Sequence, residues 1–139
     1  MWQIYALLSA LFASLTAIFA KVGISGVNST LATAVRTIFV LLMAWGMVAL
    51  TGQGQGLRAL SGKSWCFLAL SGIATGASWL CYYKALQSGP VTPVVTIDKF
   101  SLVLTMLLAA VFLGEALNWK TALGAGLITA GTLLVAFAK

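Results

Sequence analysis

Five charged side chains lie within or at the ends of long apolar segments, and their types suit solute binding and proton transfer. In chain order they are Lys21, Arg36, Lys84, Asp98 and Lys99. A charge at the centre of a bilayer costs about 2.5–3.5 kcal/mol on insertion scales, so such residues are read first as functional. Four cations with one acid predict a polar cavity for a carboxylate or another anionic group.

Depth separates these five residues. Lys21 and Lys84 are near predicted helix ends, where long side chains can reach the headgroups, whereas Arg36 and Lys99 are about two turns deeper. Asp98 is too short to do this, so it must face protein or water, be protonated, or pair with a cation. Its neighbour Lys99 points about 100° away on a helix. We therefore expect Lys99 to be a poor partner, and both a structural ion pair and a proton-coupling role for Asp98 stay open.

Further polar and aromatic side chains lie in the third and fourth apolar segments of the chain. They are Ser78, Trp79, Tyr82 and Tyr83 in the third apolar segment, where the three rings add aromatic surface, and Thr96 and Ser101 in the fourth. At helical spacing these residues can line a wet pathway or form hydrogen bonds between helices, and the sequence favours neither. Arg36, Tyr82, Lys84, Asp98 and Lys99 form the predicted binding set. Lys21, Ser78, Trp79, Thr96 and Ser101 are possible additions.

Catalytic and metal-binding patterns are missing from the sequence. The chain has no His, two acids, no Gly-rich phosphate loop and no Cys/His metal spacing. We expect neither an enzyme nor a bound metal or cofactor. The second acid, Glu115, follows the fourth segment and is predicted to be structural, either pairing with Lys120 or favouring the N-terminus of the last helix.

The elements that position these residues are membrane-spanning helices. The 139 residues are 61% hydrophobic and 7% charged, against about 45–50% and about 25% in soluble domains. Stretches of about 20 apolar residues, the length that spans a bilayer, cover most of the chain. The sequence predicts an all-α integral membrane protein, one domain over 1–139, with five transmembrane helices at about 2–22, 30–50, 65–87, 91–113 and 119–138.

The cationic residues bear on orientation rather than on nucleic acid, because no basic cluster exists to neutralise phosphates. Five spans place three flanking cations on each side: Arg58, Lys63 and Lys120 on one, Lys21, Lys84 and Lys139 on the other. Orientation normally follows an excess of Lys and Arg on the cytoplasmic side. The balance is compatible with dual topology, in which copies insert both ways, or with one orientation favoured by a small margin.

Small residues recur at helical spacing in three predicted spans, which indicates close helix packing. The stripes are Ala6, Ala10, Ala13 and Ala17 in the first span, Gly72 and Gly76 in the third, and Thr121, Ala125, Thr132 and Ala136 in the fifth. One copy offers little room for a solute pathway, so we expect at least a dimer.

The run from Tyr82 to Ser101, which includes Ile-Asp98-Lys-Phe-Ser, and the later Phe112-Leu-Gly-Glu115 resemble the second half of an EamA domain. Ala20-Lys21 with Val35-Arg36 resembles its first two helices, and Leu123–Gly131 its last. The domain belongs to the drug/metabolite transporter superfamily, in which most members carry two such domains as inverted repeats. The chain departs from the pattern at Asn118-Trp119-Lys120, where many members have a Pro-containing turn.

The resemblance implies a secondary transporter, an exporter of small metabolites in a bacterial or archaeal inner membrane. A single repeat would pair with an antiparallel copy, or with a homologous partner, to form ten helices around a site near the midplane. Two alternatives stay open: a non-transporting membrane subunit, such as a lipid-handling or assembly partner, and a small multidrug exporter of cations. The second normally has four helices and an acid in the first, which this chain lacks.

Overall fold

The computed structural model describes residues 1–138 as helices and short connections, without a strand; Lys139 lies outside the described residues. The helices are α1 (Trp2–Gly23), α2 (Ser29–Leu50), the 3₁₀-helix η1 (Gln53–Ala59), α3 (Gly62–Ser88), α4 (Val91–Asp98), α5 (Ser101–Phe112) and α6 (Trp119–Phe137). Five segments are long and apolar enough to cross a membrane, with α4 and α5 together forming one of them. The predicted all-α, five-span fold is confirmed.

Polar residues and one glycine set the ends of the helices. The Asn28 side chain accepts hydrogen bonds from two backbone amides at the start of α2, and Asn118 accepts one from Thr121 N at the start of α6. Both satisfy amides that have no partner within their helix. The chain leaves α5 through Gly114, whose φ of +67° favours a residue without Cβ.

The fourth span is broken near its middle, which the sequence analysis did not predict. α4 ends at Asp98 and α5 begins at Ser101, while Lys99 and Phe100 between them keep helical backbone dihedrals and form a 3₁₀ turn. Across the break, Phe100 N donates to Ile97 O at 2.9 Å and Leu102 N donates to Lys99 O at 3.0 Å. These are the tighter i→i−3 bonds of a 3₁₀ turn, so the interruption keeps backbone groups paired. Neither Gly nor Pro lies at the break, so neither of the usual helix breakers marks it.

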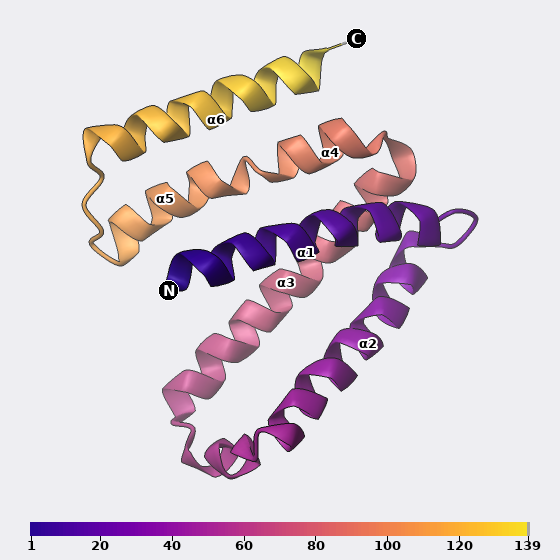
Figure 1. Cartoon of the computed structure of the whole chain (residues 1–139), viewed down its shortest axis with the longest axis vertical. Coiled ribbons are helices and arrows are strands. Elements are labelled where there is room, and N and C mark those ends of the chain that lie inside the picture. Colours follow the sequence, from indigo (N-terminus) through magenta and orange to yellow (C-terminus); the bar gives the residue numbers. More distant parts are fainter. Residues whose placement is uncertain (139) are drawn as a thin grey trace. The chain divides into compact units, whose positions relative to one another are not determined.

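The chain forms two compact units. The central unit is residues 20–87, and the flanking unit is residues 1–19 together with the chain from Ser88 onward. Within the flanking unit, α6 packs against both α4 and α5 (Figure 1). The less exposed residues of α6 lie on one stripe, which includes the predicted Thr121, Ala125, Thr132 and Ala136. Small side chains on this stripe allow close approach of the helices.

Within the central unit, the buried residues gather at the end where α1 finishes, α2 begins and α3 finishes. They are Ala20, Ile24, Ser29, Thr33, Tyr83 and Leu86. A Cβ added at Gly72 or Gly76 of α3 would meet no atom within 4 Å, as is also true of the glycines of α6.

Packing on α6 gives a first prediction. Replacing the half-buried Ala125 with Leu should overpack the contact with α4 and α5 and cost about 1–3 kcal/mol, lowering the thermal midpoint in detergent micelles. Ala130→Leu, the same change on the exposed side of the helix, is the matched control. Equal midpoints for the two variants would contradict this packing.

Candidate functional site

Arg36 on α2 is held by the aromatic face of α3. Its guanidinium carbon lies 4.0 Å from the ring centroid of Trp79 and 5.7 Å from that of Tyr83. Both distances are within the range of about 6 Å over which a cation is attracted to an aromatic face. Arginine suits this contact because its planar guanidinium is weakly hydrated and stacks well. The sequence brings the two rings to one face, since residues four apart on a helix are neighbours.

The two helices carry Arg36 and Trp79 to similar depth. Gln87 Nε2 near the end of α3 donates to Val27 O just before α2 at 2.7 Å, so these two helix ends lie together. Arg36 is about two turns into α2 and Trp79 about two and a half turns before the end of α3, or about 10–14 Å at 1.5 Å per residue. The contact with Trp79 thus holds the guanidinium within the span instead of at its end.

Lys21 of α1 contacts the last turn of α3, at the end of the central unit where Gln87 bonds to Val27. The Leu86 carbonyl would accept from the amide of residue 90 if α3 continued, but residue 90 is proline and has no N–H. Lys21 Nζ donates to this carbonyl. An open pocket of about 250 Å³ lies beside it, lined by Lys21, Ile24, Ser25, Gly26 and Gln87. This contact gives Lys21 a structural role at the joint between α1 and α3.

Tyr83 is the residue of this cluster that the predicted binding set omits. It is buried, with 4% of its surface exposed, whereas the predicted Tyr82 is half-buried and meets the Tyr83 ring edge-to-face at 6.2 Å. The i, i+4 spacing of Trp79 and Tyr83 is the signal that identifies it. Ser78 and Lys84 are exposed positions of α3.

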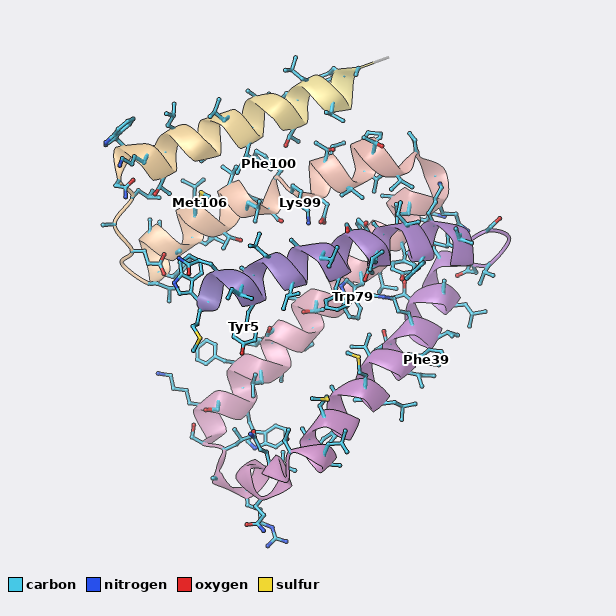
Figure 2. The ribbon with its side chains drawn as sticks, in the orientation of Figure 1. Tyr5, Phe39, Trp79, Lys99, Phe100 and Met106 are labelled. Carbon is cyan, nitrogen blue, oxygen red and sulfur yellow. The ribbon has the colours of Figure 1, made fainter. Side chains whose placement is uncertain are left out.

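The break in the fourth span carries the predicted acid. Asp98 Oδ2 lies 4.0 Å from Lys99 Nζ, and their side chains are 40% and 50% exposed. Lys99 was expected to be a poor partner, and its separation from Asp98 lies at the outer limit of ion-pair range. The pair is long and half-exposed, so it contributes little binding energy. Figure 2 shows Phe100 pointing toward α6 and Lys99 pointing away from it.

Threonines surround the break on the α6 side. Thr96 Oγ1 donates to Thr92 O at 2.8 Å within α4, and the buried Thr132 of α6 donates a long hydrogen bond of 3.5 Å to Thr96 O. This bond ties α6 to the end of α4. Ser101 is exposed at the start of α5.

Among the predicted site residues, the structure brings Arg36 and Trp79 together in the central unit, and Thr96, Asp98 and Lys99 around one break in the flanking unit. Glu115 is exposed in the connection before α6, where its backbone amide bonds to Ala109 O at 3.3 Å. Residues 1–138 contain no group of three or more His, Cys, Asp or Glu that could hold a metal ion.

Comparison with known proteins adds two findings. The model of the EamA-like transporter family matches residues 1–137. A Sinorhizobium sp. protein named as an uncharacterized transporter in the cobO 3' region is 50% identical over 135 residues, which cover 97% of this chain and 96% of that protein. No solved structure matches the chain.

The lysine contact at the end of α3 gives a second prediction. Lys21→Met keeps much of the apolar length of the side chain but removes the donor to Leu86 O, which should cost about 1.5–3 kcal/mol, the range for hydrogen bonds to charged groups. The thermal midpoint in detergent should fall accordingly. Lys63→Met, at an exposed position at the start of α3, is the control. If both variants unfold at the wild-type temperature, Lys21 does not stabilise this joint.

Proposed function

Because the chain belongs to the EamA-like transporter family, we propose that it is a secondary transporter that exports small metabolites by alternating access. It is a multi-pass membrane protein with five spans. Our proposal adds the direction of transport, the class of solute and an energy source other than ATP.

The observation that carries the proposal is the break at Lys99 and Phe100. Within the span Val91–Phe112, this break falls near the middle. Discontinuous helices form the binding and coupling sites of many transporters. In this span the interruption is a 3₁₀ turn whose backbone groups stay paired, so it is the side chains at the turn that are available to a solute or a proton. Here the break carries a carboxylate and an ammonium group that are both partly exposed. Asp98 is our candidate for the proton-binding group.

We further propose that two copies associate antiparallel in the inner membrane, giving ten helices. The two sides carry near-equal numbers of flanking Lys and Arg residues. Because an excess of these residues on one side normally fixes that side in the cytoplasm, the balance supports insertion in both orientations. The small residues Gly72 and Gly76 of α3 support association, because lipid-embedded helices join through such surfaces.

The test is export from proteoliposomes. The purified protein is reconstituted into vesicles loaded with a bacterial metabolite extract, and mass spectrometry follows which compounds leave under an imposed pH gradient. We expect selective loss of a few compounds relative to protein-free vesicles. If no compound leaves faster than from those vesicles, the transport proposal is wrong.

The two acids of the chain give a third prediction. Asp98→Asn removes the proposed proton-binding carboxylate at nearly constant size, so export should no longer accelerate with the pH gradient. Glu115→Gln makes the same chemical change in an exposed connection and should keep the wild-type dependence. Initial efflux rates at a series of external pH values would measure both. An unchanged pH profile in Asp98→Asn would exclude Asp98 as the coupling residue.

A further inference from the structure

We propose that Arg36, braced by Trp79 and Tyr83, is the binding point for the carboxylate of the exported solute. This inference rests on the proposed transport function and names the class of its substrate. Its basis is the placement of the Arg36 hydrogen-bond donors within the central unit.

Within the central unit, the flat face of the Arg36 guanidinium contacts aromatic rings, whereas the N–H groups on its rim have no hydrogen-bond acceptor there. Within the central unit, residues 20–87, its guanidinium contacts the rings of Trp79 and Tyr83, and neither a hydrogen bond nor an ion pair from it is present. A guanidinium carries five N–H donors around its rim. Stacking uses the face and leaves these donors available, in the fork geometry that matches the two oxygens of a carboxylate.

Depth favours a solute over a lipid headgroup. The phosphates of lipids lie outside the hydrocarbon core, which is about 30 Å thick. The Trp79 contact holds the guanidinium about 10–14 Å from the helix ends, by the rise of α2 and α3. A positive charge at that depth needs an anion or water. A carboxylate carried into the site by a solute provides the anion.

Trp79 and Tyr83 act as positioning residues. The buried Tyr83 and the half-buried Trp79 present a rigid aromatic surface that fixes the plane of the guanidinium. A fixed fork binds a carboxylate at a lower entropic cost than a mobile one. Lysine at position 36 would keep the charge but would lose both the stacking and the paired donors.

The experiment measures binding and export separately. Thermal unfolding of delipidated protein in detergent is followed with millimolar benzoate, pyruvate, succinate or glutamate, with benzamide as the uncharged match to benzoate, and with inorganic phosphate. The same variants are then tested in the proteoliposome assay, in vesicles with and without phosphatidylglycerol. The variants are Arg36→Gln, Arg36→Lys, Trp79→Phe and Trp79→Leu. The control is Arg58→Gln, which changes the only other arginine, exposed in η1.

We expect at least one carboxylate to raise the wild-type midpoint, and benzamide to leave it unchanged. Arg36→Gln and Arg36→Lys should lose this shift and lower carboxylate export about tenfold, since a charge-assisted bidentate pair is lost. Trp79→Phe should retain most of the shift, Trp79→Leu should weaken it, and Arg58→Gln should match the wild type.

Three results would overturn the inference. The first is that no carboxylate stabilises the wild-type protein. The second is that export is normal in wild type but Arg36→Lys and Arg36→Gln release carboxylates at the wild-type rate. The third is that phosphate or phosphatidylglycerol, and no carboxylate, gives the Arg36-dependent effect, which would identify a phosphate site. Absence of all export with intact carboxylate binding would reject the proposed function and leave the binding point standing.

Discussion

The hydrocarbon layer contains no water to bond to the backbone, and this constraint accounts for most of the structure. It requires helices over nearly the whole chain and allows breaks only where backbone groups find other partners. The break in the fourth span meets this condition with i→i−3 bonds. At the end of α3, the Lys21 side chain donates to the Leu86 carbonyl, because Pro90 has no N–H to donate to it. The same lack of water makes every charged side chain within the membrane costly in free energy, so we expect each to have a partner or a functional role.

The two units handle their charges in different ways. In the central unit, Arg36 is stacked on Trp79, and its position is set by contacts to the face of the guanidinium. In the flanking unit, Asp98 and Lys99 sit at a helix interruption in a loose pair with both side chains partly exposed. A rigid cation suits recognition of an anion, and a loosely held carboxylate suits reversible protonation. This division assigns solute binding to one unit and coupling to the other within our proposal.

The length of the apolar segments predicted the fold well, whereas the local backbone geometry within a span was not predicted. Apolar length predicted the five spans, and the expected start of the last span at 119 agrees with the start of α6 at Trp119. The 3₁₀ turn at Lys99 and Phe100 was missed because it contains neither Gly nor Pro. In the candidate site, residue type and depth in the span led to the choice of Arg36, and the structure places its guanidinium over Trp79. Tyr83 was expected only to add aromatic surface and was left out of the binding set, because the sequence alone does not show which of two adjacent tyrosines faces Arg36.

The central claim is that two copies of this five-span unit form the transporter in opposite orientations. Single cysteines at Ser25 and Gln55, on opposite ends of α2, would be introduced into a Cys66→Ala, Cys81→Ala background and labelled with a membrane-impermeant maleimide on sealed, right-side-out vesicles. Our account predicts partial labelling at both positions, with the remainder reached only after the membrane is permeabilised. Complete labelling at one position and none at the other would show a single orientation and contradict the antiparallel pair.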